Sequence, residues 1–457
     1  MIEKVPPSGQ ISAQEDPSDN SSEPTPENDS LDIQQRLLEE VGYPEIRGNQ
    51  KLAEVCEKLL DIFGNRSKYK LLLSYRDEEA QSILNLSQAL LYTPYIGSRL
   101  KNELVVAIQR LSEKSALCPE CFTLKDVVIE GEYPISAGQF GEVWKGIFSR
   151  QSVSLKVVKA YRHSQIHGLL RAFSREAVLW GQLSHENVLP FYGVFALGSA
   201  HKRICLVSPW MDNGDINNFL TENPSANRTL LICDVASGVG YLHQNNIIHG
   251  DLKGPNILVT SAQRACLADF GLSTIRDPEV LRMTSSVGHT GGTVRWMAPE
   301  LLDPEHERIN SKESDIYAFA CVCYEEKYLT FLLQQIFTGQ IPFYEILRDE
   351  TVSLKVNKGY RPSRPVEDSP PFVEWGLTAS MWRLMENCWN QEISDRPHAR
   401  NILRRLPTVD THPRDPTSSG YISPSLFRTA AGADLDKYLL DSRILRLLDV
   451  DTASLLP

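Results

Sequence analysis

Three short blocks in the second half of this 457-residue chain restrict its possible folds more than any other feature. They are residues 249–256 (HGDLKGPN), residues 269–271 (DFG) and residues 292–300 (GTVRWMAPE). Asp269 follows Asp251 by eighteen residues. The blocks combine carboxylates, a lysine, an amide and glycines at defined spacings, and chance agreement over all three is negligible. Any fold assigned to the chain has to accommodate them in this order.

These blocks resemble the signature of the eukaryotic protein kinases. Residues 206–211 (LVSPWM) and 296–300 (WMAPE) look like the tyrosine-kinase-like group of Ser/Thr kinases, of the type that fungi carry behind an N-terminal helical region. The resemblance covers residues 124–406. It implies an α+β, bilobal protein kinase fold, with a β-rich N-lobe at about 124–208 and a mainly helical C-lobe at about 212–406.

The resemblance implies a role for each polar residue of the first two blocks. Asp251 would accept the proton of the attacking hydroxyl, and Lys253 would contact the γ-phosphoryl group of ATP. Asn256 and Asp269 would hold Mg²⁺ across the phosphates. This agrees with the chemistry of phosphoryl transfer, which needs metal ligands, a fixed cation and a group that orients the nucleophile.

The same resemblance implies where ATP binds. Lys156, at the end of a predicted strand, would hold the α- and β-phosphates and be oriented by an ion pair with Glu176. Residues 208–211, which follow the apolar run 204–207, match the strand and hinge beside the adenine. The full set of implied ATP-binding positions is Ile135, Gly138, Gly141, Val143, Lys156, Ser208, Trp210 and Met211.

Residues 135–143 form a predicted turn between two strands, with Gly138 and Gly141 at close spacing. Glycine lets backbone N–H groups approach a polyphosphate without an intervening side chain. Many hairpins have two glycines, so this pattern gains weight only from the blocks that follow. Ser136 stands where the first loop glycine is usual, and we expect weaker ATP binding, not its loss.

The residue that usually anchors a phosphorylated activation segment differs from the family pattern in this sequence. Gly250 replaces the arginine that normally precedes the catalytic aspartate and pairs with a phosphate in this segment. We therefore expect activity that depends little on phosphorylation of the segment. It nevertheless contains hydroxyl groups that could accept phosphate, which are those of Thr284, Ser285, Ser286, Thr290 and Thr293.

A second departure is a ten-residue addition, residues 326–335, inside the helix expected after Asp315. Ten residues lengthen a helix by roughly 15 Å and rotate it by about 1000°, which is about 80° short of three turns. A continuous helix would turn the wrong face to the C-lobe. The addition therefore loops out, or it is absent from the mature protein as an unspliced intron would be, or it disrupts the domain.

The remaining parts of the chain differ in composition. Residues 1–30 are acidic and poor in apolar residues, which predicts a disordered leader. Residues 31–117 show apolar stripes at helical spacing and predict a small helical module that packs or binds a partner. Residues 407–457 are expected to be a C-terminal tail with one amphipathic stretch at 435–448. We further expect Glu300 and Arg396 to form a buried structural ion pair.

Composition argues against several classes of protein. The formal net charge of −11 disfavours a nucleic-acid or anionic-membrane binder, because both need a basic face. The most apolar segment, residues 316–337, contains the charged residues 325–327, which disfavour a membrane span. Nine scattered cysteines without an export signal predict reduced thiols and a cytoplasmic location. One CxxC, at Cys118 and Cys121, lacks the second pair of a zinc site.

These observations lead to one expected function and two alternatives. The chain is expected to transfer the γ-phosphate of ATP, with Mg²⁺, to Ser or Thr hydroxyls of protein substrates in intracellular signalling. One alternative is a pseudokinase scaffold that binds ATP weakly and a protein partner through the helical module. Ser136 and the ten-residue addition favour it, whereas the intact Lys156, Asp251, Asn256 and Asp269 favour the enzyme. A third hypothesis, death-type signalling through the front helices, rests only on their position.

Overall fold

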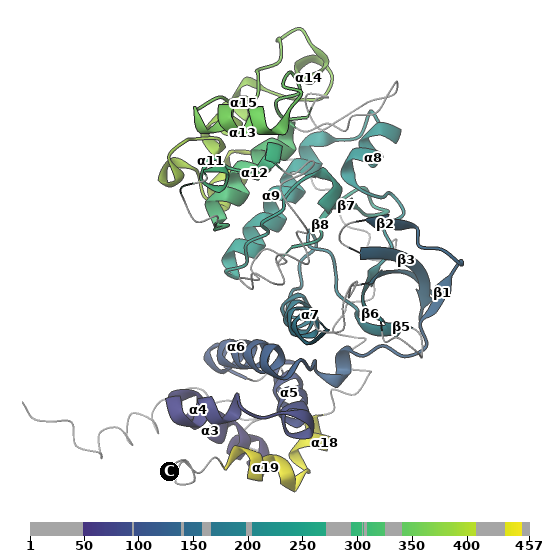
Figure 1. The fold of residues 1–457 in the computed structure, drawn as a ribbon, viewed down its shortest axis with the longest axis vertical. Helices are drawn as coiled ribbons and strands as arrows, with labels where there is room; N and C mark the ends of the chain where they lie inside the picture. Colours follow the sequence, from purple (N-terminus) through teal and green to yellow (C-terminus); the bar gives the residue numbers. More distant parts are fainter. Residues whose placement is uncertain are drawn as a thin grey trace, which may run out of the picture.

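The computed structural model describes residues 49–93, 96–138, 141–157, 166–197, 203–270, 294–303, 305, 309–324, 341–407 and 435–449. The acidic leader, the five hydroxyl residues of the activation segment and the ten-residue addition lie outside this part of the chain. The described residues form a helical module, a β-rich N-lobe and a helical C-lobe, stacked in that order along the long axis (Figure 1). The predicted α+β, bilobal fold is confirmed.

The N-lobe is a curled antiparallel sheet with one helix, α7 (Ile166–Gly181), beside it. Its strands pair in the order β1-β3-β4-β6-β5, with β2 on β3. They are β1 (Val128–Glu130), β2 (Ser136–Gly138), β3 (Gly141–Phe148), β4 (Gln151–Val157), β5 (Gly193–Leu197) and β6 (Arg203–Pro209). In β4, Val153, Leu155 and Val157 are buried on one face. Because side chains alternate along a strand, Lys156 projects from the other face.

The C-lobe is built around a helix that is buried on all sides, α12 (Lys312–Tyr324). Such a helix is apolar all round and has no amphipathic stripe. Trp382 and Trp389 pack beside its end, where both rings are buried with their centroids 5.7 Å apart. No helix among the described residues is long and apolar enough to cross a bilayer.

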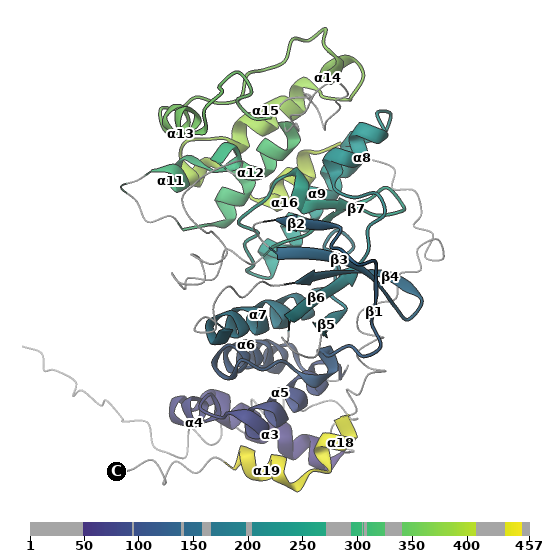
Figure 2. The ribbon, with the colours of Figure 1, turned by 45° about the vertical axis from the view of Figure 1, so that its right-hand side comes forward.

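The other C-lobe elements surround α12 (Figure 2). Its helices are α8 (Ile216–Glu222), α9 (Arg228–Gln244), α11 (Pro299–Leu302), α13 (Asp349–Asn357), α14 (Pro370–Val373), α15 (Ala379–Cys388) and α16 (Ala399–Arg405). Its short elements are η3 (Gly254–Asn256), β7 (Ile257–Val259), β8 (Ala265–Leu267), η5 (Val294–Trp296) and η6 (Ile393–Asp395). The β7–β8 hairpin places the end of the first block and the start of the second side by side.

The described part of the helical module begins with four helices. They are α3 (Gln50–Gly64), α4 (Arg66–Leu72), α5 (Asp77–Leu91) and α6 (Ser98–Ser115). Asn65 separates the first two, because its side-chain oxygen accepts the N–H groups of Ser67 and Lys68 and so begins α4. A single turn, η1 (Glu120–Phe122), links the module to the N-lobe.

Two helices from the far end of the sequence complete this module. These are α18 (Leu435–Leu439) and α19 (Ser442–Leu448), which pack under α3 and α5 (Figure 1). The Tyr75 hydroxyl donates to the Leu447 carbonyl oxygen at 2.7 Å, and Lys58 forms an ion pair with Asp449. We therefore propose that residues 435–449 belong to the same packed unit as residues 50–115. The expected separate tail would then be limited to the rest of residues 407–457.

Truncation of one buried apolar side chain should show whether the packing of α18 and α19 against α3 and α5 stabilises the module. Ile444→Ala removes a side chain that is 1% exposed and is expected to lower the free energy of unfolding by about 2–5 kcal/mol. Leu440→Ala is the matched control, because Leu440 is 71% exposed in the same segment. Urea unfolding followed by far-UV circular dichroism measures both. Equal losses for the two variants would contradict the proposed packing.

Candidate active site

The first block lies between α9 and β7 and is held in place by Asp315, near the start of α12. The Asp315 carboxylate accepts the backbone N–H groups of His249 and Gly250, each at 2.8 Å. His243 Nε2 lies 2.9 Å from the same carboxylate. Asp315 is 2% exposed, so these hydrogen bonds form away from water and fix the path of the loop.

Gly250 adopts a backbone conformation that favours glycine. Its φ is +76°, in the left-handed region. A residue with a side chain costs roughly 1–2 kcal/mol there. The glycine that replaces the usual arginine therefore relaxes the backbone just before Asp251, in addition to removing a cation.

The structure brings Asp251, Lys253 and Asn256 together. Lys253 Nζ lies 2.8 Å from Asp251 Oδ2. Asn256 Nδ2 donates to the same Oδ2 at 3.0 Å and to the Asp251 carbonyl oxygen at 2.7 Å. One cation and one amide therefore set the orientation of the Asp251 carboxylate.

Lys156 and Asp269 face this group from the N-lobe and from the end of β8. Lys156 Nζ is 2.6 Å from Asp269 Oδ1. Burial favours an uncharged lysine, but the nearby carboxylates of Asp269 and Glu176 outweigh it and raise the pKa of Lys156. Burial likewise opposes ionisation of Asp269, but Lys156 outweighs it and lowers the pKa of Asp269. Both groups are therefore charged at neutral pH.

The expected ion pair between Lys156 and Glu176 is not formed. Among the described residues, the carboxylate within 4.0 Å of Lys156 is that of Asp269. Glu176 lies in α7, and burial raises its pKa to about 7, although the charge of Lys156 lowers it in part. Lys156 contacts Asp269 in place of Glu176. Glu176 then stays farther from the cation, and a carboxyl group withdrawn from water in that position retains its proton more readily.

The predicted glycine-rich turn is present as the β2–β3 hairpin. Gly141 has φ +134°, and a Cβ there would lie 2.2 Å from the Val157 carbonyl oxygen, so only glycine fits. The Ile135 N–H donates to the Val143 carbonyl oxygen at 2.8 Å. Val143 is the direct cross-strand partner of Lys156, which places the hairpin beside the lysine. Gly138 ends β2, and the two residues that follow it lie outside the described chain.

The predicted hinge follows β6. Ser208 is buried and pairs across the sheet with Ser154 in β4. The Trp210 N–H donates to the Ser152 carbonyl oxygen at 3.0 Å, and Lys145 Nζ lies 5.2 Å from the centre of the Trp210 ring. These contacts fix the backbone next to Met211, whose N–H has no hydrogen bond to any described residue. A backbone N–H at this point can donate a hydrogen bond to a ring nitrogen of adenine.

Asn256 and Asp269 fit a magnesium ion that is shared with phosphates. They offer an amide oxygen and a carboxylate, the hard ligands that Mg²⁺ prefers, and Mg²⁺ takes few protein ligands when phosphates supply the others. The two hydrogen bonds from Asn256 Nδ2 leave the oxygen of that amide for a cation. Within the described ranges, no cluster of three or more His, Cys, Asp or Glu side chains could hold a metal alone.

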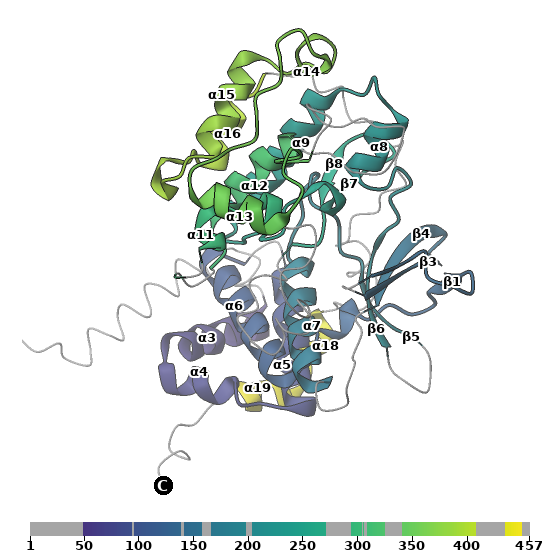
Figure 3. The same cartoon turned by 45° about the horizontal axis from the view of Figure 1, so that its top comes forward.

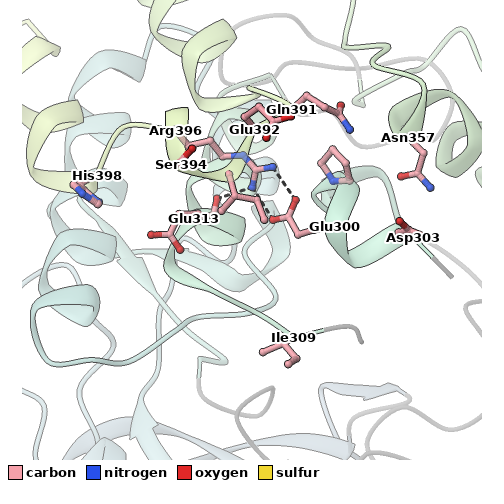
Figure 4. A pocket seen from close by; sticks show the side chains of 12 residues that line it. Glu300, Asp303, Ile309, Glu313, Asn357, Gln391, Glu392, Ser394, Arg396 and His398 are labelled. Carbon is pink, nitrogen blue, oxygen red and sulfur yellow. Dashed lines mark hydrogen bonds and ion pairs between the residues drawn. The ribbon is translucent and has the colours of Figure 1, made fainter. Parts of the chain in front are cut away.

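The third block contributes structure to the C-lobe. Arg396 forms two hydrogen bonds to Glu300, each at 2.7 Å, which confirms the predicted buried ion pair (Figure 4). Arg295 donates to Asp349 and to three carbonyl oxygens between residues 342 and 346. The expected phosphate acceptors Thr284, Ser285, Ser286, Thr290 and Thr293 lie outside the described residues.

Comparison with known families agrees with this geometry. The model of the protein tyrosine and serine/threonine kinase family matches residues 129–406, more than half of the chain. The chain belongs to this family. The matched residues include the glycine-rich hairpin, Lys156, all three blocks and the Glu300–Arg396 ion pair of this kinase.

Several individual kinases and one receptor are similar to this kinase. Serine/threonine-protein kinase STY17 of Arabidopsis thaliana is 30% identical over 279 residues, covering 60% of this chain and 43% of that protein. Human Ephrin type-A receptor 1 is 30% identical over 287 residues, covering 61% and 26%. Serine/threonine/tyrosine-protein kinase HT1 of Arabidopsis thaliana is 25% identical over 282 residues, covering 60% and 65%. The chain thus spans less than half the length of the first two relatives.

Sequence reasoning missed one group of residues around this site. They are Phe122, Trp180 of α7 and Phe191, which are buried and form a series of ring contacts that reaches Phe270 of the second block. Their apolar character predicts burial but gives no sign of which residues they contact. Their contacts depend on where the helical module docks, and no local pattern encodes that.

Proposed function

We propose that the protein is an ATP-dependent serine/threonine protein kinase. The observation that carries the proposal is the arrangement of Asp251 with Lys253 and Asn256, opposite the Lys156–Asp269 pair. Such a set combines a proton acceptor, two cations and two oxygen ligands. Phosphoryl transfer depends on positioning and on neutralising charge, and these residues supply both.

Each residue has a defined part in the proposed reaction. Asp251 accepts a hydrogen bond from the substrate hydroxyl and takes its proton as the new oxygen–phosphorus bond forms. The bond between the γ-phosphorus and the oxygen that bridges the β- and γ-phosphates breaks in the same step, and ADP leaves. Lys253, 2.8 Å from that carboxylate, balances charge on the transferred group. Lys156 positions the phosphates that stay with the nucleotide. Mg²⁺, held by Asn256 and Asp269, would neutralise charge on the phosphate oxygens.

Three features support Ser and Thr as the acceptors. Lys253 stands two residues after the proposed base, as is usual in Ser/Thr kinases. The name of the plant relative STY17 is serine/threonine-protein kinase, whereas that of HT1 also includes tyrosine. Thr293 supports the same proposal from the sequence alone, because in Ser/Thr kinases a threonine at this place and a lysine at the place of Lys253 are linked to the catalytic aspartate. The fungal grouping and the signalling role remain predictions.

The pseudokinase alternative has little support from the site. The residues required for transfer are present, and the structure brings Asp251, Lys253 and Asn256 into contact. The missing contact between Lys156 and Glu176 concerns the position of α7 and does not remove any of them. We therefore retain the helical module as a candidate partner-binding element of an enzyme, and its partner remains a proposal.

A cytoplasmic location is proposed from the thiols. All nine cysteines lie among the described residues as thiols and not as disulfides, and most are buried. Burial raises the pKa of Cys118 to about 11 and that of Cys205 to about 12, so they are poor nucleophiles and stay protonated. Free thiols of this kind are usual in a reducing compartment.

The test of the proposed function is transfer of labelled phosphate from Mg-ATP to a mixture of serine, threonine and tyrosine peptides. Acid hydrolysis of the products then identifies the phosphorylated residue. We expect phosphoserine and phosphothreonine. Phosphotyrosine alone would overturn the acceptor class. The kinase proposal would be overturned if neither the wild type nor a variant that lacks residues 326–335 transferred phosphate to any peptide or to the protein itself.

A further inference from the structure

The helical module is not an independent domain, because it packs along α7, the helix that carries Glu176. Figures 2 and 3 show α6 and α7 side by side, with α7 between the module and the sheet. One continuous buried apolar core includes Leu104 and Ile108 of α6 and Phe173 and Ala177 of α7. The module therefore buries a face of α7 that would otherwise be exposed.

Polar contacts fix the register of this interface. Gln182 Nε2, just after α7, donates to Gln88 Oε1 of α5 at 2.7 Å. Gln88 is 0% exposed, so this hydrogen bond lies within the interface. The Asn85 side-chain oxygen accepts the backbone N–H of Glu120 at 2.8 Å, which ties η1 to α5. Displacing the module would leave these buried polar groups unsatisfied.

Phe122, the last residue of η1, fits against the end of α7 with no spare room. A Cβ placed on Gly181 would lie 2.6 Å from Phe122 Cζ and 2.9 Å from Cε2. Both are atoms at the far end of the Phe122 ring, which is itself completely buried. The close approach of module and helix therefore requires a glycine at position 181 when phenylalanine occupies position 122.

A series of aromatic contacts leads from Phe122 to the active site. The Phe122 and Phe191 ring centroids are 5.7 Å apart, and those of Phe191 and Trp180 are 5.1 Å apart. Trp180 contacts Phe270, next to Asp269, with centroids 5.8 Å apart. Phe270 in turn lies 6.3 Å from the ring of His249, two residues before Asp251.

We propose that the helical module is a positioning element of the kinase, which sets the position of α7 through the contact of Phe122 with Gly181. The proposal rests on the proposed function and names how that site is held. Phe122 is a positioning residue, because the aromatic series places other side chains between it and the reacting atoms. A shift of α7 moves Trp180, which removes the support of Phe270 and misplaces Asp269 relative to Lys156.

A pair of size changes tests this in the full-length protein. Gly181→Ala adds the methyl group that collides with Phe122, and Phe122→Leu removes the ring atoms in its path. We expect Gly181→Ala to lower kcat by about 10- to 100-fold at saturating ATP, since small misplacements at a reacting centre have effects of this size. The double variant should recover much of the loss. Gly64→Ala is the matched control, because Gly64 also ends a helix and a Cβ placed on it would meet no atom within 4 Å.

Two readouts separate a positioning role from a purely structural one. If Gly181→Ala lowers the melting temperature but leaves kcat unchanged at a temperature where it is folded, the proposal is wrong. A loss of kcat that Phe122→Leu does not relieve would equally overturn the role of Phe122. Hydrogen exchange of residues 265–270 should rise in Gly181→Ala and not in Gly64→Ala. This second readout needs no activity. If the wild type and a variant that lacks residues 326–335 were both inactive, the proposed function would be overturned, while hydrogen exchange would still decide the positioning role.

Discussion

Asp251→Asn is expected to lower kcat for phosphate transfer by about 10²- to 10⁴-fold, the range attributed to a general base. Asparagine keeps the size of the side chain and can still contact Lys253 and Asn256, which lie 2.8 and 3.0 Å from Asp251 Oδ2. It cannot take up the proton of the attacking hydroxyl. The loss should therefore appear in kcat, with little change in the KM for ATP.

The measurement is the initial rate of transfer from labelled Mg-ATP to a serine or threonine peptide, with melting temperatures as a control for folding. Equal rates for the wild type and Asp251→Asn would show that Asp251 is not the base. A wild type without activity would be compared with a variant that lacks residues 326–335. Activity in that variant would attribute the defect to the ten-residue addition, and continued silence would count against the enzyme.

Arg396→Ala is expected to lower the free energy of unfolding of the C-lobe by about 3–5 kcal/mol, as is typical when one partner of a buried ion pair is removed. The Arg396 side chain is 0% exposed and makes two hydrogen bonds to Glu300. It also donates to the carbonyl oxygens of Asn390 and Glu313. All of these acceptors lose their donor in the variant, and Glu300 retains an uncompensated charge.

Arg364→Ala provides the control for this second variant. Arg364 is paired with Glu367 at 2.8 Å, but both side chains are exposed, and surface pairs contribute only about 0–1 kcal/mol. Chemical unfolding followed by tryptophan fluorescence reports on the C-lobe, because Trp382 and Trp389 lie in its core. Losses of similar size for the two arginine variants would contradict a structural role for the Glu300–Arg396 pair.

The sequence predicts the parts of the site that local chain geometry determines. Asp251, Lys253 and Asn256 are close in sequence, and a short loop followed by η3 is enough to bring them together. The Glu300–Arg396 pair spans 96 residues and was predictable only through the family resemblance. The core positions of Trp382 and Trp389 follow from helical periodicity.

The sequence does not predict which carboxylate Lys156 contacts. Glu176 and Asp269 are both within range of its charge, and the choice depends on the exact position of α7 relative to β8. That position is set by packing between distant segments, including the helical module. Periodicity in residues 435–448 likewise predicts an amphipathic helix but does not identify α3 and α5 as the surface that it covers.

The helical module combines helices that precede the kinase lobes in the sequence with helices that follow them, and this has a consequence for biosynthesis. A ribosome delivers α3–α6 before both kinase lobes and α18–α19 after them. The lobes can begin to fold as units during translation, while the apolar surface of α3 and α5 stays uncovered until α18 and α19 emerge. Nascent and prematurely terminated chains would thus expose apolar surface that chaperones and proteases recognise, which gives the cell a means to distinguish finished kinase from incomplete product.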